Sequence, residues 1–198
     1  MHTPNRDEIT GLVLAGGRAT RMGGLDKGLV AFGGRTLVDQ VIERLQPQVG
    51  AILISANRNI DTYRTFGFPV LLDADDGLEP FPGPLAGMLA GLRAARTSWL
   101  AAVPCDAPLL PVDLVSRLAS SLAASRAAVA YAGELIEPMF CLLHTDLARD
   151  LADAMAHGER RAEAWLRGIG AAPAVFLRPE SFANLNTLQE VRAHDGRH

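Results

Sequence analysis

A glycine-rich and basic segment near the start of the sequence most constrains how this chain can fold. It runs from Leu14 to Gly28 and follows the apolar run 12–14, which predicts a short buried strand. Glycines let a backbone approach a ligand closely, and the N–H groups of such a loop can point at anionic oxygens. Arg18, Arg21 and Lys27 add charge that suits phosphate. The segment predicts an anion-binding loop rather than a flexible turn with solvated cations.

Two common phosphate-binding motifs do not fit this loop. A Walker loop needs glycine before its lysine and a hydroxyl residue after it, whereas Lys27 lies between Asp26 and Gly28. The dinucleotide fingerprint Gly-x-Gly-x-x-Gly cannot be aligned with Gly16-Gly17. A P-loop NTPase and an NAD-linked dehydrogenase therefore lose their main support in the sequence.

Size and composition indicate an ordinary globular chain. It has 198 residues, a net charge of −3 and 48% hydrophobic residues, which favours one domain over residues 1–198. The charge gives no reason to expect nucleic acid or a membrane surface as partner, and no apolar run is long enough to span a bilayer. Cys105 and Cys141 lack metal-ligand spacing, so we expect reduced thiols and a cytoplasmic location.

Apolar runs alternate with amphipathic segments along most of the chain. The runs predict strands at residues 12–14, 51–54, 70–72, 99–103, 127–131, 139–143 and 175–177, and helices are expected to begin near Thr36, Pro84, Pro111, Thr145 and Thr187. This order is typical of an α/β fold, a three-layer Rossmann-like arrangement with a mainly parallel sheet and helices on both faces. Ligands bind beyond the carboxyl ends of such strands, so Gly16, Asp73 and Asp106 should converge at one edge.

The loop also resembles a known signature. It reads Leu-Ala-Gly-Gly, then Arg-x-x-Arg-Met-Gly-Gly, then Asp-Lys-Gly, and further motifs occur at 82–87, 104–108, 158–161 and 184–187. Over about residues 10 to 190 the chain resembles the molybdenum cofactor guanylyltransferases, the MobA family, within the nucleotidyltransferases of the nucleotide-diphospho-sugar transferase type. The resemblance implies transfer of GMP from GTP to Mo-molybdopterin with release of pyrophosphate. It also implies partner proteins that insert molybdenum and mature molybdoenzymes.

Asp106 is the leading candidate for a metal ligand. It follows a buried strand in Pro104-Cys105-Asp106-Ala107-Pro108, and Mg²⁺ prefers one or two carboxylates together with phosphate oxygens. The plain alternative is an aspartate that only forms a turn before proline. The resemblance also assigns Mg²⁺ to this position, with Mn²⁺ as the alternative ion. Lys27 and Arg21 are expected to contact phosphate and the leaving pyrophosphate.

The resemblance implies two sets of binding residues. The first is nucleotide-binding, in the part from about residue 10 to 110, and comprises Leu14, Ala15, Gly16, Gly17, Lys27, Ser55, Asn57, Asp73 and Asp106. Asp73 can instead be a simple loop carboxylate, and Ser55 stands where family members often carry Asn, so the contact at Ser55 and the preference for guanine stay open. The second set is acceptor-binding, mostly in residues 111–193, and comprises Pro82, Gly83, Arg160, Arg161, Asn184 and Asn186. The plain alternative for the arginines and asparagines of this set is a solvated helix start and a capped turn.

Two other functions remain compatible with these residues. One is a related nucleotidyltransferase that uses CTP or a sugar phosphate acceptor. The other is an accessory protein that binds GTP without turnover. Release of pyrophosphate with an acceptor present separates the second from any transferase.

Overall fold

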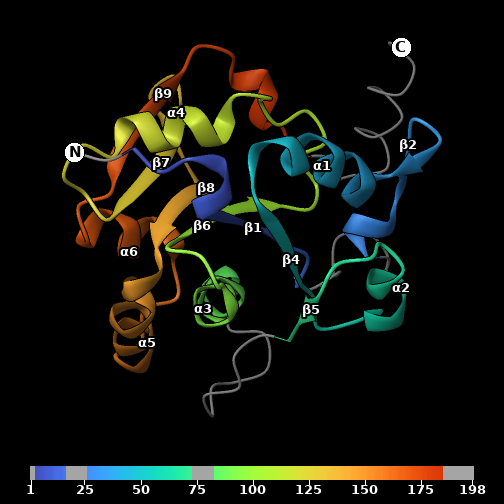
Figure 1. Ribbon diagram of the computed structural model, residues 1–198, viewed down its shortest axis with the longest axis horizontal. Helices are drawn as coiled ribbons and strands as arrows, with labels where there is room; N and C mark the ends of the chain where they lie inside the picture. Colours follow the sequence, from blue (N-terminus) through green and yellow to red (C-terminus); the bar gives the residue numbers. More distant parts are fainter. Residues whose placement is uncertain (1–2, 17–25, 73–82, 185–198) are drawn as a thin grey trace.

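The computed structural model describes residues 3–16, 26–72 and 83–184, and its centre is a seven-stranded sheet. The strand order is β5-β4-β1-β6-β8-β7-β9 (Figure 1). Six strands run parallel to one another, and β8 is antiparallel to both of its neighbours. The strands are β1 (Ile9–Leu14), β4 (Ala51–Ser55), β5 (Val70–Leu71), β6 (Trp99–Pro104), β7 (Ala127–Ala132), β8 (Leu135–His144) and β9 (Ala172–Phe176). The predicted mainly parallel α/β sheet is confirmed.

Helices cover both faces of the sheet (Figure 1). The helices α1 (Leu37–Leu45) and α4 (Leu114–Ser121) lie over one face, and α3 (Pro84–Ala94), α5 (Ala148–Ala156) and α6 (Ala162–Gly168) lie over the other. Alternate residues of β1 are buried on opposite sides: Val13 belongs to the core beneath α1, and Leu12 to the core beneath α3. Burial on both faces explains why the strands read as continuous apolar runs.

Short elements complete the described chain. The helix α2 (Ile60–Arg64) precedes the edge strand β5, and β2 (Ala31–Phe32) pairs with β3 (Arg35–Thr36) in a separate hairpin. Single 3₁₀ turns are η1 (Arg6–Glu8), η3 (Lys27–Leu29), η4 (Gln46–Gln48), η5 (Thr145–Leu147) and η6 (Pro179–Phe182).

The predicted helix starts are partly right. The Thr36 hydroxyl accepts the backbone N–H of Asp39 at 3.3 Å and so caps α1, and Pro84 is the first residue of α3. By contrast, α4 begins at Leu114 rather than at Pro111. Thr145 does not cap α5, because its hydroxyl donates to the carbonyl of Ser98 and α5 begins only after a 3₁₀ turn.

Two further differences concern the C-terminal half. The last strand begins at Ala172 and ends at Phe176, one residue before Leu177, which is 86% exposed. The helix α6 was not predicted. The helix expected from Thr187 lies outside the described residues.

Two glycines bring α3 close to the sheet. A Cβ atom added at Gly87 would lie 2.7 Å from Ser55 Oγ and 2.8 Å from Leu14 Cδ2, and one added at Gly91 would lie 2.6 Å from Leu12 Cδ2. The two glycines are four residues apart and therefore face the same side of the helix. Their missing side chains set the distance between α3 and the strands β1 and β4.

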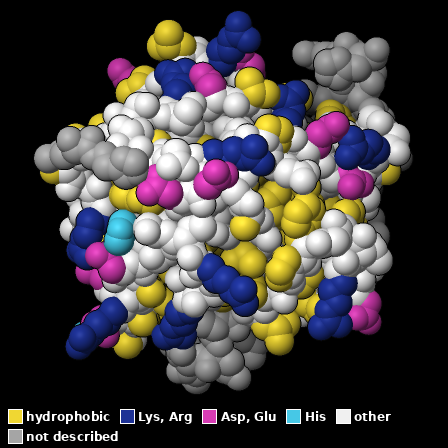
Figure 2. All heavy atoms as spheres, viewed as in Figure 1, with side chains coloured by type: hydrophobic (Ala, Val, Ile, Leu, Met, Phe, Trp, Pro, Cys, Tyr) yellow, Lys and Arg dark blue, Asp and Glu magenta, His cyan; other side chains and the backbone are white. Residues whose placement is uncertain are grey.

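The surface carries mixed charge. Figure 2 shows basic and acidic side chains interspersed on the face in view, with hydrophobic side chains gathered to the right of centre. Within the described ranges, none of the helices has the length and apolarity needed to cross a lipid bilayer.

Candidate functional site

Four strands end at the same level of the sheet. Leu14, the last residue of β1, pairs with Ser55 at the end of β4 and with Pro104 at the end of β6, and Ser55 pairs with Leu71 of β5. The ladder continues past the strands, because Ala15 N donates to Ser55 O at 2.7 Å and Cys105 N donates to Leu14 O at 3.1 Å. Gly16, Asn57 and Asp106, which follow β1, β4 and β6, therefore emerge side by side at one carboxyl edge, as expected for Gly16 and Asp106, whereas Asp73 lies outside the described residues.

Asp106 and Lys27 meet at this edge. Lys27 Nζ lies 3.2 Å from Asp106 Oδ2, so the basic loop contacts the carboxylate that follows β6. The side chains of Lys27 and Asp106 are 26% and 12% exposed. The contact is therefore part-buried and joins a cation and a carboxylate that come from distant parts of the sequence. The structure brings together the two described residues to which we assign catalytic roles.

The neighbouring thiol is buried. Burial raises the pKa of Cys105 well above its usual value, and the adjacent Asp106 carboxylate adds to the shift. A raised pKa favours the protonated thiol near neutral pH, which is a poor nucleophile. Cys105 and Cys141 are both buried and free.

The predicted nucleotide contacts differ in accessibility. Ser55 is only 1% exposed, and its hydroxyl lies against Gly87 of α3. Leu14 and Ala15 are also buried, whereas Gly16 and Asn57 are half-buried at the carboxyl edge. A ligand at this edge meets backbone groups of the first loop and the side chain of Asn57 more readily than the side chain of Ser55.

The predicted acceptor-binding segments approach each other from distant parts of the chain. Gly83 has a positive φ of 86° and precedes α3, and a Cβ atom added there would lie 3.8 Å from Arg160 O. Arg160 Nη1 donates to Met155 O at 2.7 Å and so satisfies a carbonyl at the C-terminal end of α5. Arg161 is exposed just before α6, and Asn184 is half-buried after η6.

Glu159 organises the turn between α5 and α6, and sequence reasoning assigned it no function beyond its place in the motif. Its Oε1 accepts the backbone N–H groups of Arg161 at 2.9 Å and Arg160 at 2.8 Å. These hydrogen bonds favour the carboxylate and lower the pKa of Glu159. These hydrogen bonds therefore fix the backbone of the turn at both arginines.

Other predicted residues cannot be placed. Gly17, Arg18, Arg21, Asp73, Pro82 and Asn186 lie outside the described residues.

The carboxylate at this edge suits Mg²⁺ that is coordinated mainly by a bound phosphate compound. In the ranges 3–16, 26–72 and 83–184 no three His, Cys, Asp or Glu side chains gather into a metal-binding group. Mg²⁺ is commonly bound by one or two carboxylates with substrate phosphates and water, and Asp106 beside the predicted phosphate-binding loop offers such a carboxylate. Asp106 therefore fits a divalent cation that arrives with a phosphate ligand.

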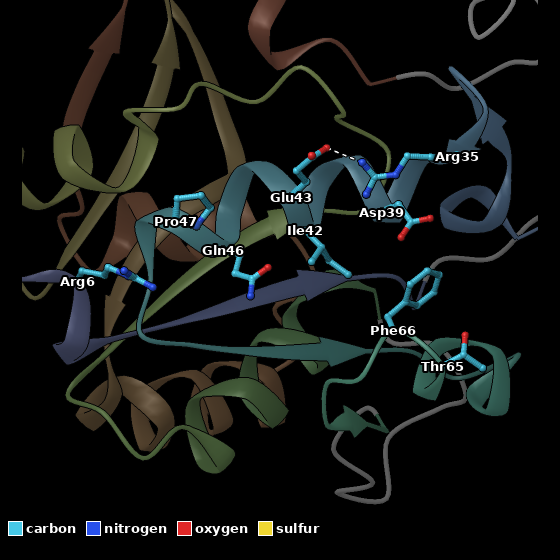
Figure 3. A pocket seen from close by; sticks show the side chains of 9 residues that line it. All are labelled: Arg6, Arg35, Asp39, Ile42, Glu43, Gln46, Pro47, Thr65 and Phe66. Atoms are coloured by element: carbon cyan, nitrogen blue, oxygen red, sulfur yellow. Dashed lines mark hydrogen bonds and ion pairs between the residues drawn. The ribbon is translucent and has the colours of Figure 1, made fainter.

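A separate cavity lies away from this edge. Figure 3 shows it beside α1, with a volume of about 580 Å³ and an Arg35–Glu43 ion pair of 2.7 Å on its wall. Its lining residues are Arg6, Arg35, Asp39, Ile42, Glu43, Gln46, Pro47, Thr65 and Phe66. None of these belongs to the predicted nucleotide or acceptor set, so this cavity is not the candidate site.

Comparison with solved structures defines the class of fold. Molybdopterin-guanine dinucleotide biosynthesis protein A from Archaeoglobus fulgidus superposes with a TM-score of 0.74 at 20% identity, covering 95% of this chain and 97% of that one. The 2-C-methyl-D-erythritol 4-phosphate cytidylyltransferase from Thermus thermophilus gives 0.71 at 17% identity, with 95% and 97% covered. At these identities the likeness establishes a shared nucleotidyltransferase fold.

Comparison of sequences then defines the family. The model of the MobA-like NTP transferase domain matches residues 11–175. A molybdenum cofactor guanylyltransferase from Burkholderia orbicola is 47% identical over 203 residues, covering 98% of both chains. One from Cupriavidus taiwanensis is 44% identical over 199 residues, covering 97% of this chain and 98% of that protein. The chain belongs to the MobA-like NTP transferase family and is a nucleotidyltransferase.

Proposed function

We propose that this protein transfers GMP from GTP to Mo-molybdopterin and releases pyrophosphate. The observation that carries the proposal is the contact of Lys27 with Asp106 at the edge where β1, β4, β5 and β6 end together. Relatives named molybdenum cofactor guanylyltransferase, matching nearly the full length of the chain, support GTP and Mo-molybdopterin as the substrates.

The reaction asks for positioning and charge neutralisation more than for covalent chemistry. The terminal phosphate oxygen of the acceptor attacks the α-phosphorus of GTP, a new P–O bond forms, and the bond to the β-phosphate breaks as pyrophosphate leaves. The attacking phosphate is already ionised near neutral pH, so no general base is needed. In-line placement of the two phosphates and neutralisation of the growing charge supply the rate enhancement.

Each residue has a proposed role in that scheme. Backbone groups of the first loop, Gly16 and Gly17 among them, bind the triphosphate, and Lys27 with Arg21 stabilises the departing pyrophosphate. Asn57 contacts the nucleoside from the end of β4. Asp73 is assigned to the same nucleotide. We assign Asp106 to a divalent ion, Mg²⁺ with Mn²⁺ as the alternative, which when bound neutralises phosphate charge.

The acceptor is assigned to the second group of segments. Gly83 and the turn that carries Arg160 and Arg161 approach each other, and cations at such a corner suit the phosphate of a pterin. Pro82, Asn184 and Asn186 complete the proposed acceptor set. We also propose that the protein is cytoplasmic. Its proposed protein partners are the proteins that insert molybdenum and those that mature molybdoenzymes.

Nucleotide selectivity tests the proposal. The purified protein is given Mo-molybdopterin and Mg²⁺ with GTP, CTP, ATP or UTP, and pyrophosphate release is followed beside the mass of the dinucleotide product. We expect GTP to be the preferred donor, with molybdopterin guanine dinucleotide as product. Preference for CTP would show that the protein is a cytidylyltransferase rather than a guanylyltransferase. Tight binding of GTP without release of pyrophosphate with any acceptor would indicate an accessory protein that binds GTP without turnover.

A further inference from the structure

A hydrogen-bond network around Asp26 adjoins the Lys27–Asp106 contact, and the proposed reaction gives it no role. Asp26 is 9% exposed, and its Oδ1 accepts the hydroxyl of Tyr63 at 2.6 Å. Its Oδ2 accepts Nδ2 of Asn59 at 3.1 Å. A buried carboxylate is costly unless it is hydrogen-bonded, and both of its oxygens have donors here.

The carboxylate does not serve the role expected of its position. Asp26 immediately precedes the 3₁₀ turn η3, where an aspartate usually caps the turn, yet its side chain makes no capping hydrogen bond. The carboxylate instead reaches across to α2 and to Asn59, which precedes that helix in a left-handed conformation with φ of 49°. The side chain therefore fastens the end of the basic loop to a different part of the fold.

Tyr63 is built to donate this hydrogen bond. It is fully buried in the core beneath α1, and burial raises its pKa far above the usual value, with Cys105 and Asp26 adding to the shift. The hydroxyl is therefore protonated at every physiological pH. A short hydrogen bond from a neutral donor to a buried carboxylate is among the stronger kinds in proteins.

Gly28 makes room for the bond. A Cβ atom added at Gly28 would lie 2.6 Å from Tyr63 Oη and 3.3 Å from Cys105 Cβ. Lys27 thus stands between Asp26, which is fixed to Tyr63, and Gly28, which lies against the same hydroxyl. One side chain, Tyr63, thus holds the residue before Lys27 by a hydrogen bond and packs close to the residue after it.

We propose that Tyr63, through its hydrogen bond to Asp26, is a positioning residue that fixes Lys27 at the Asp106 carboxylate for phosphate contact. The inference rests on the proposed function, because it assigns Tyr63 a part in that same site. Without the hydroxyl, Asp26 keeps only the hydrogen bond from Asn59, so the loop end is held less firmly and Lys27 leaves the geometry that it has 3.2 Å from Asp106.

A double-mutant cycle tests the proposal. The variants Tyr63→Phe, Lys27→Ala and the double variant are compared with the wild type in steady-state GMP transfer, well below their melting temperatures. We expect Tyr63→Phe to lower kcat by about 10-fold, with a much smaller change in KM for GTP, because displacing a reacting contact by a fraction of an ångström costs rate. In the Lys27→Ala background the same change should alter the rate less than about 2-fold. Equal losses in both backgrounds would overturn the proposal.

Matched variants separate positioning from general damage. Tyr131→Phe removes the other tyrosine hydroxyl of the chain, on β7 outside the site, and should leave kcat unchanged. Asp26→Asn keeps an acceptor for Tyr63 and should retain more activity than Asp26→Ala. Gly28→Ala should reproduce the loss seen in Tyr63→Phe. If Tyr131→Phe lowers kcat as much as Tyr63→Phe, or Asp26→Asn is no better than Asp26→Ala, the inference is wrong.

A crystal structure of Tyr63→Phe decides the matter independently of turnover. We expect Lys27 Nζ to lie beyond ion-pair distance of Asp106 Oδ2, whereas an unchanged contact of 3.2 Å would overturn the inference. A wild type that transfers no GMP would refute the proposed function instead, and the distance in this crystal would still test the role of Tyr63.

Discussion

Replacing Gly87 by alanine should loosen the contact between α3 and the sheet. The added Cβ would lie 2.7 Å from Ser55 Oγ and 2.8 Å from Leu14 Cδ2, which is well inside ordinary contact distance. Ser55 and Leu14 are 1% and 9% exposed and end adjacent strands, so neither side chain has open space into which it can move. The added methyl group therefore displaces these two buried side chains or moves the helix outward.

The magnitude follows from two opposing effects. Overpacking a well-filled core costs about 1–3 kcal/mol. Alanine is favoured over glycine inside a helix by about 1 kcal/mol. We therefore expect Gly87→Ala to lower the free energy of unfolding by up to about 2 kcal/mol, which corresponds to a fall in Tm of up to about 8 °C for a chain of this size.

Denaturant unfolding followed by circular dichroism measures this difference. Gly168→Ala is the matched control, because Gly168 is also helical and a Cβ atom there would meet nothing within 4 Å. We expect the control to be as stable as the wild type or slightly more so. If Gly87→Ala unfolds at the same denaturant concentration as Gly168→Ala, with equal m-values, the close-packing argument is refuted.

Three other substitutions test the site and the fold. Asp106→Asn should lower the rate of pyrophosphate release by about 10³-fold, because a neutral amide cannot hold a divalent ion as a carboxylate does, while circular dichroism stays unchanged; full turnover would remove Asp106 from the mechanism. Gly50→Ala should destabilise the fold by about 2 kcal/mol in urea, since the added Cβ would lie 2.9 Å from the backbone Cα of Asp7, which cannot rotate away; an unchanged midpoint would contradict this. Glu159→Gln should make the stability of the protein depend less on pH in the acid range. The lowered pKa of Glu159 contributes stability above the unfolded value of 4.5, and this stability is lost as the pH falls through the folded pKa. If the variant loses as much stability as the wild type between about pH 7 and pH 3, the carboxylate does not contribute.

Periodicity predicted the parts of the fold that depend on local pattern. Apolar runs located the seven strands of the large sheet, and Thr36 with Asp39 marked the start of α1. The direction of β8 was not predicted, although Gly133 and Glu134 alone separate it from β7 and a two-residue connection makes two strands antiparallel. The hairpin of β2 and β3 also had a signal, because Gly33 and Gly34 both take the positive φ that a type I′ turn requires.

The sequence predicted which residues belong to the candidate site but not how their side chains contact one another. That Lys27 and Asp106 belong to one edge follows from the strand ends, whereas their 3.2 Å contact depends on how the loop is anchored. The anchor, Tyr63, is a buried aromatic residue in a short helix, and nothing in the local sequence distinguishes it from any other core residue. Long-range hydrogen bonds of this kind come from tertiary packing, which a single sequence does not encode in its periodicity.

The reversed strand β8 has a consequence for where the arginine turn arrives. His144, at the end of β8, pairs with Trp99, at the beginning of β6, so the chain leaves the sheet on the side opposite Asp106. The helix α5 has nine residues and is about 13 Å long, and it returns toward the edge that carries Asp106, so that Arg160 lies beside Gly83. A strand in the usual direction would have sent the same helix the other way. The antiparallel direction of β8 thus places the turn at Arg160, from the second half of the chain, at the same edge of the sheet as the residues from the first half.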